Sequence, residues 1–107
     1  MRVTLIGHAS LLFETRGGTV LMDPVFLDPF EGGAVASCPE REVDVEQLPE
    51  IDYLVLSHRH PDHFDIPSLA RLPSTCRVFC PADAQLLYAL DQLGFARVTP
   101  LDPRRLL

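Results

Sequence analysis

The sequence predicts an α/β domain, and three observations lead to this fold class. The opening residues hold short β-rich runs separated by glycine, which is typical of a β-meander. The second half alternates apolar runs with segments of helical spacing, as strands joined by helices do. The chain has 107 residues, of which 47% are hydrophobic, so it is globular and large enough for one packed core. We therefore expect a single domain over residues 1–107.

The opening half predicts three strands followed by a long irregular segment. Gly17-Gly18 marks a hairpin turn. Asp23-Pro24 ends the third run, because proline cannot donate to a ladder. Residues 24–50 are rich in proline and acidic side chains, so an irregular acidic loop is expected there. The expected strands lie at residues 3–6, 10–14 and 19–22.

The second half predicts a buried strand and then alternating helices and strands. The run at 51–57 is almost continuously apolar, as in a strand covered on both faces. Leucines recur at helical spacing over 83–93, and Gly94 follows as a stop signal, so this stripe is expected to pack in the core. The other expected elements are a helical turn at 66–72 and strands at 77–80 and 96–99.

Composition excludes several classes of function. The formal net charge is -6 and no basic run occurs, so the chain lacks the electrostatic footprint of a nucleic-acid binder. It has no apolar run of membrane-spanning length and no signal-peptide pattern. Its three cysteines are an odd count, which fits reduced cytoplasmic thiols, and we expect Cys76 and Cys80 to be small buried hydrophobes. These features predict a cytoplasmic protein.

The chemistry is concentrated in residues 57–63, Ser-His-Arg-His-Pro-Asp-His, directly after the apolar run. Three of the four histidines lie there, and imidazole and carboxylate are ligands of zinc and related metals. Side chains at i and i+2 of an extended backbone point the same way, so His58 and His60 can bind one metal. Asp62 and His63 suit a second metal, and with one metal Asp62 is the candidate catalytic general base.

Two residues far upstream are candidates for the same site. His8 follows a strand-ending glycine and is either an ordinary loop residue or a residue that lines the site. Asp23 ends a strand and is either a local turn residue or the acceptor that orients a metal-ligating histidine.

The pattern His58-x-His60-x-Asp62-His63 after a hydrophobic strand resembles the signature of the metallo-β-lactamase-fold superfamily. Gly7-His8-Ala9-Ser10 and Asp23-Pro24 are similar to the start of its lactonase-like branch, which includes relatives of the ascorbate-6-phosphate lactonases and N-acyl-phosphatidylethanolamine phospholipase D. The resemblance covers residues 2–99. It implies the N-terminal half of an αβ/βα sandwich, with a mixed β-sheet and helices on one face.

The resemblance also implies roles for these residues. His58 and His60 would bind the first metal, Asp62 and His63 the second, Asp23 would steady the histidine loop, and His8 would line the site. Zinc is the usual metal, with manganese or iron in some branches. The implied reaction is hydrolysis of an ester, lactone or phosphodiester in a small-molecule substrate by metal-bound hydroxide. The alternatives are a non-catalytic half-domain that binds metal or a partner, and a mononuclear-iron redox enzyme similar to sulfur dioxygenases.

No histidine follows the motif, although the second half of the family fold supplies further ligands. The resemblance therefore implies a partial domain with an uncovered apolar sheet face. We expect this face to pair with a complementary C-terminal half or with a second copy of the chain, and we expect enzymatic activity only when the site is completed in this way.

Overall fold

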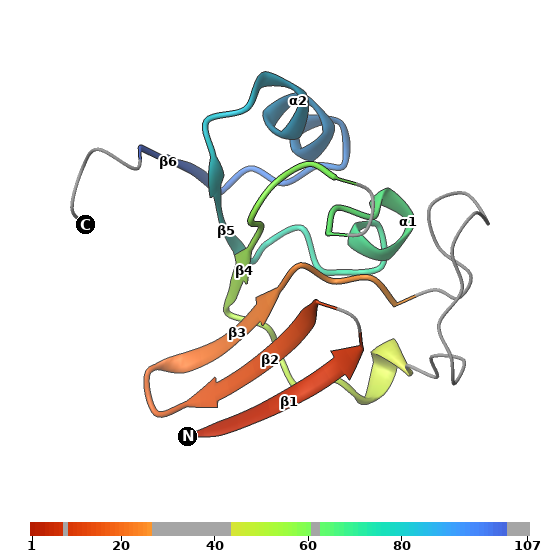
Figure 1. Ribbon diagram of the computed structural model, residues 1–107, viewed down its shortest axis with the longest axis vertical. Coiled ribbons are helices and arrows are strands. Elements are labelled where there is room, and N and C mark those ends of the chain that lie inside the picture. Colours follow the sequence, from red (N-terminus) through yellow and green to blue (C-terminus); the bar gives the residue numbers. More distant parts are fainter. Residues whose placement is uncertain (8, 27–43, 61–62, 103–107) are drawn as a thin grey trace.

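The computed structural model describes residues 1–7, 9–26, 44–60 and 63–102, and it confirms the α/β class (Figure 1). Six strands form one mixed sheet in the order β1-β2-β3-β4-β5-β6. The strands from β1 to β3 are antiparallel, and those from β3 to β6 are parallel. The elements are β1 (Arg2–Gly7), β2 (Ser10–Thr15), β3 (Gly18–Met22), η1 (Val45–Gln47, a 3-10 helix), β4 (Tyr53–Val55), α1 (Ile66–Leu69), β5 (Arg77–Pro81), α2 (Ala84–Gln92) and β6 (Val98–Leu101).

Local signals set the ends of the two α-helices: α2 matches the predicted 83–93 to within one residue at each end, whereas α1 begins at the predicted residue but ends at Leu69 instead of 72. Asp65 caps α1 by accepting from Ser68 N, and Asp83 caps α2 by accepting from Gln85 N and Leu86 N. Gly94 ends α2 with a φ of 91°, a left-handed conformation that glycine adopts without strain. The strand predicted at 51–57 is shorter than expected, since only Tyr53–Val55 is assigned to β4.

The helices cover one face of the sheet. From β3 to β6, each parallel strand lies next to the preceding one, always further along the sheet in the same direction. Crossover connections between parallel strands are right-handed, so the connections that contain α1 and α2 lie on the same side of the sheet. Figure 1 shows α1 and α2 on this side of the central strands. The mixed sheet with helices on one face is therefore confirmed.

The hydrophobic core lies between the helices and the sheet. Leu69 of α1 is fully buried. Leu86 and Leu90 of α2 are also fully buried, and Leu87 and Leu93 pack partly buried against the same core, which confirms the predicted leucine stripe. Tyr88, which falls outside that stripe, is 68% exposed. Residues in register across four strands face these leucines and are at most 4% exposed: Leu12, Leu21, Leu54 and Val78.

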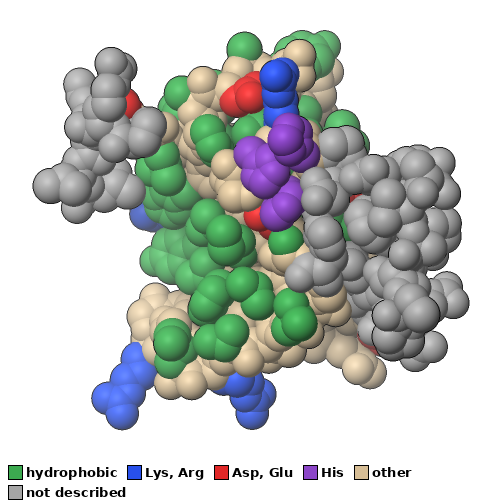
Figure 2. Space-filling model, viewed as in Figure 1, with side chains coloured by type: hydrophobic (Ala, Val, Ile, Leu, Met, Phe, Trp, Pro, Cys, Tyr) green, Lys and Arg blue, Asp and Glu red, His purple; other side chains and the backbone are tan. Residues whose placement is uncertain are grey.

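The opposite face of the sheet, which we call the open face, is apolar and carries neither α-helix in the described structure. Residues that alternate with the core positions lie on it, and they are half-buried or exposed, with Leu5 65% exposed. Figure 2 shows hydrophobic side chains gathered in a patch with histidine side chains at its edge. The open face comprises Val3, Leu5, Leu11, Phe13, Val20, Met22, Tyr53, Val55, Phe79, Pro81 and Leu101.

Two further expectations concern the cysteines and the membrane. Cys76 and Cys80 are buried free thiols, as predicted, and desolvation raises the pKa of each. For Cys80 the nearby carboxylate of Asp83 adds a smaller increase in pKa. Both therefore stay protonated and behave as small apolar side chains. Among the described residues, no helix has the length and apolar character needed to cross a membrane.

Candidate metal site

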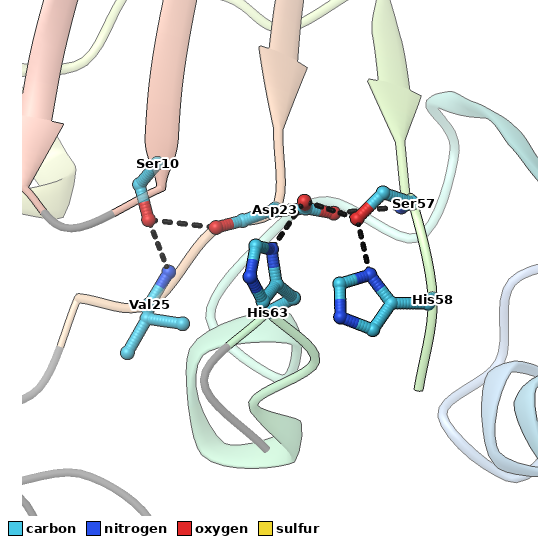
Figure 3. Close-up of polar contacts among 6 residues, drawn as sticks. All are labelled: Ser10, Asp23, Val25, Ser57, His58 and His63. Atoms are coloured by element: carbon cyan, nitrogen blue, oxygen red, sulfur yellow. Dashed lines mark hydrogen bonds and ion pairs between the residues drawn. The ribbon is translucent and has the colours of Figure 1, made fainter. Parts of the chain in front are cut away.

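The site is built at the carboxyl ends of β3 and β4, which are parallel neighbours. Asp23 follows β3 directly and is 2% exposed. Its φ is 44°, in the left-handed region that aspartate tolerates better than most residues. Its backbone N–H donates to Val55 O at 3.0 Å, and its carbonyl accepts from Ser10 Oγ at 2.6 Å. The tight turn after β3 is thus fixed on both sides, and it places the Asp23 carboxylate beside the end of β4 (Figure 3).

The Asp23 carboxylate accepts three hydrogen bonds from the histidine segment. Ser57 N donates to Oδ1 at 2.8 Å, and Ser57 Oγ donates to Oδ2 at 2.5 Å. His63 Nδ1 lies 2.9 Å from the same Oδ2 (Figure 3). A carboxylate only accepts hydrogen bonds when ionised, so His63 carries its proton on Nδ1. Asp23 therefore contacts a histidine of the motif, as the second of its two expected roles requires, and the binding of metal by that histidine stays a prediction.

Three histidine side chains of the motif lie together. The His58 ring centroid is 4.7 Å from that of His60 and 4.2 Å from that of His63. The backbone explains the clustering, because His60 O accepts from both His63 N at 2.9 Å and Phe64 N at 2.8 Å. These two bonds hold residues 63 and 64 against His60, so His63 lies beside His58.

The loop is also tied to the second helix. Arg59 Nε lies 3.4 Å from Asp83 Oδ2, while Asp83 Oδ1 caps α2 by accepting from Gln85 N at 2.9 Å. The Arg59 and Asp83 side chains are 51% and 28% exposed, so the pair positions the loop more than it stabilises the fold.

Sequence reasoning missed three serines that hold this site. Ser10 Oγ accepts from Val25 N at 2.9 Å, and Ser68 Oγ accepts from Phe26 N at 2.8 Å, so two buried hydroxyls fix the chain after Asp23. Ser57 joins Asp23 to His58, whose Nδ1 is 2.8 Å from Ser57 Oγ. The position of Ser57 directly before the first histidine is the one sequence signal that could have found it.

The structure leaves the ligand roles as predictions. Asp62 and His8 lie outside the described residues. Within residues 1–7, 9–26, 44–60 and 63–102, no three His, Cys, Asp or Glu side chains are arranged to hold a metal ion. The types of donor nevertheless suit a divalent transition metal. Three imidazole rings lie together, and the Nδ1 atoms of His58 and His63 lie against Ser57 and Asp23, as in histidines that bind metal through Nε2.

Comparison with known proteins gives a clear family match. Residues 2–101 match the family described as the β-lactamase superfamily domain. A Mycolicibacterium smegmatis protein named as a Rieske 2Fe-2S iron–sulfur protein is 36% identical over 99 residues, which cover 89% of this chain and 19% of that protein. The N-acyl-phosphatidylethanolamine-hydrolyzing phospholipase D 1 of Caenorhabditis elegans is 34% identical over 73 residues, or 64% of this chain and 20% of that protein.

Solved structures share the fold. An isothiocyanate hydrolase from Delia radicum gut bacteria superposes with a TM-score of 0.75 at 22% identity, covering 100% of this chain and 44% of its own. CmlA, a diiron β-hydroxylase from Streptomyces venezuelae, superposes with a TM-score of 0.72 at 31% identity, covering 98% of this chain and 21% of its own. The chain thus spans about a fifth of the two curated relatives and less than half of either solved structure.

Proposed function

The chain belongs to the β-lactamase superfamily, and on this premise we propose that it is the metal-binding portion of a metal-dependent hydrolase. The observation that carries the proposal is the cluster of three histidines at the end of β4, two of which have Nδ1 against Asp23 or Ser57. Metal-ligating histidines characteristically use their second ring nitrogen in this way.

The proposed ligands are His58, His60 and His63, with Asp62 joining them from the sequence pattern. Zinc is the proposed metal, and manganese or iron would suit the same donors. A bound divalent ion would supply a lowered pKa for water and polarise the bond to be cleaved. Among the protein groups, Asp23 and Ser57 would hold the rings in place. With a single metal bound by the histidines, Asp62 would be free to accept a proton from the attacking water.

The proposed substrate is a small molecule with an ester, lactone or phosphodiester bond. Support comes from the similarity to the C. elegans phospholipase, whose name specifies hydrolysis of a phospholipid. The likeness to a diiron β-hydroxylase at 31% identity favours a second candidate, an iron-dependent oxidation. Zinc or manganese in the purified protein would support hydrolysis, whereas iron would support the redox candidate.

The proposed hydrolysis is tested on the completed site, that is, on the chain together with a complementary second half, with a generic phosphodiester and a generic lactone in the presence of zinc or manganese. We expect metal-dependent turnover that Asp62→Ala lowers by about a hundredfold or more, the usual contribution of a general base. An Asp91→Ala variant is the control, because Asp91 lies on the exposed side of α2. Full activity in Asp62→Ala would refute its assigned role. Metal binding without turnover of either substrate would favour the non-catalytic alternative.

We also propose that the open face packs against a complementary second half, which would supply the remaining ligands. An apolar depression of about 360 Å³ lies on this face next to the site and is lined by Val55, Leu56, Ser57, Pro81 and Leu101. A second half that packs on the open face would therefore also contact the surface around Ser57. The greater length of the relatives supports this occupant, since each carries the matched region within a much longer chain.

A further inference from the structure

We propose that Ser57 is a positioning residue that holds His58 in the tautomer with the proton on Nδ1, so that the unprotonated Nε2 is presented to a metal. The inference rests on the proposed metal-binding function and adds to it a specific residue with a specific task. Ser57 is half-buried at the carboxyl end of β4, between the Asp23 carboxylate and the His58 ring (Figure 3).

The direction of the hydrogen bonds follows from counting protons. A serine hydroxyl has one proton, and the carboxylate of Asp23 has none to give when ionised. The Ser57 hydroxyl lies 2.5 Å from Asp23 Oδ2 and donates its proton to that oxygen. If the proton pointed elsewhere, two oxygen acceptors would lie at this short distance with no proton between them. Ser57 Oγ then faces His58 Nδ1 at 2.8 Å with a lone pair, so Nδ1 carries the proton.

The backbone keeps the hydroxyl in this place. Ser57 N donates to Asp23 Oδ1 at 2.8 Å, so the residue is held to the carboxylate by two separate bonds. Asp23 is itself nearly inaccessible, at 2% exposed, and its turn is fixed by Ser10. The oxygen that meets His58 is therefore fixed relative to the sheet.

One buried carboxylate thus orients two histidines by two routes. His63 Nδ1 meets Asp23 Oδ2 directly at 2.9 Å, whereas His58 meets it through the Ser57 hydroxyl. A neutral imidazole has a single N–H, so a proton on Nδ1 makes Nε2 the metal-binding atom. The two ring centroids are 4.2 Å apart, which places both rings on one side of the loop.

The experiment measures the tautomer and zinc affinity separately. Nitrogen-15 NMR of the metal-free protein, at a pH where histidine is neutral, distinguishes protonated from unprotonated ring nitrogens. In the wild type we expect His58 to be protonated at Nδ1. Ser57→Ala should shift it towards the Nε2-protonated form and weaken zinc binding about tenfold to a hundredfold. Ser57→Thr keeps the hydroxyl and should restore both properties.

Thr15→Ala is the control. Thr15 Oγ1 donates to Gly18 O at 2.8 Å in the exposed turn between β2 and β3, at the end of β3 opposite Asp23. This control should leave the His58 tautomer unchanged. An unchanged tautomer in Ser57→Ala would overturn the inference, as would an Nε2-protonated His58 in the wild type. A tautomer shift in a protein that binds no zinc would uphold the role of Ser57 and refute the proposed metal-binding function.

Discussion

Asp23→Ala is expected to lower the free energy of unfolding by roughly 2–4 kcal/mol, because the change leaves several buried or half-buried donors without an acceptor. Ser57 N, Ser57 Oγ and His63 Nδ1 all meet this carboxylate, which is 2% exposed. Alanine also lacks aspartate's tolerance for the φ of 44° at this position. Urea unfolding followed by circular dichroism measures the loss.

Asp23→Asn separates the effect of the lost hydrogen bonds from the effect of backbone strain at this position. Asparagine tolerates the left-handed region and has nearly the same shape as aspartate. Its NH2 group, however, would replace one carboxylate oxygen and would face at least one of the donors Ser57 N, Ser57 Oγ and His63 Nδ1. We expect a smaller loss of stability than in Asp23→Ala and still a weakened affinity for zinc. The control is Asp91→Asn, which removes the same charge from an exposed position and should change stability by less than about 0.5 kcal/mol. Equal stability in Asp23→Ala and the control would contradict the role given to Asp23.

The isolated chain is expected to associate in solution, because its open face exposes a continuous apolar surface. Val55 and Phe79 are paired at the middle of this face and are only half-buried. Sedimentation velocity over a range of concentrations should show species larger than a monomer. A dye that binds exposed apolar surface should also bind the chain.

A charge placed on the open face should reverse this association. Val55→Glu is expected to shift the chain to monomer and to retain its circular dichroism spectrum, since the side chain points away from the helix-covered core. Tyr88→Glu is the matched control, because Tyr88 is 68% exposed on α2 and lies off the open face. A wild-type chain that stays monomeric at high concentration and binds no dye would contradict the proposed docking surface.

Most of the fold could be predicted because its signals are local. Turn glycines, helix caps and the leucine stripe each act within a few residues, and the strands and helices appear close to where these signals placed them. The last strand shows the limit of this reasoning. It was expected at 96–99 but runs from Val98 to Leu101 and therefore includes Pro100. Because β6 lies at the edge of the sheet, the N–H that proline lacks is not needed for pairing on the open side. An edge strand can therefore continue through a proline.

The site was predictable only in part, because its contacts link distant residues. The histidines and Asp23 stood out as residue types that bind metals or orient their ligands. Ser57 and Asp23 are 34 positions apart, and Ser68 and Phe26 are 42 apart. Serine is too common for its sequence position to reveal such a contact. The contact between Ser57 and Asp23 depends on the parallel pairing of β3 with β4, which places the two strand ends side by side.

The central claim is that the segment after β4 holds a divalent metal through histidines oriented by Asp23 and Ser57. A zinc titration of the purified chain against a chromophoric chelator tests it most directly, with wild type, His58→Ala, His60→Ala and His63→Ala compared in parallel. We predict stoichiometric zinc binding by the wild type and a loss of affinity of more than about tenfold in each variant. Zinc binding that is absent in the wild type, or equally strong in all three variants, would contradict the account.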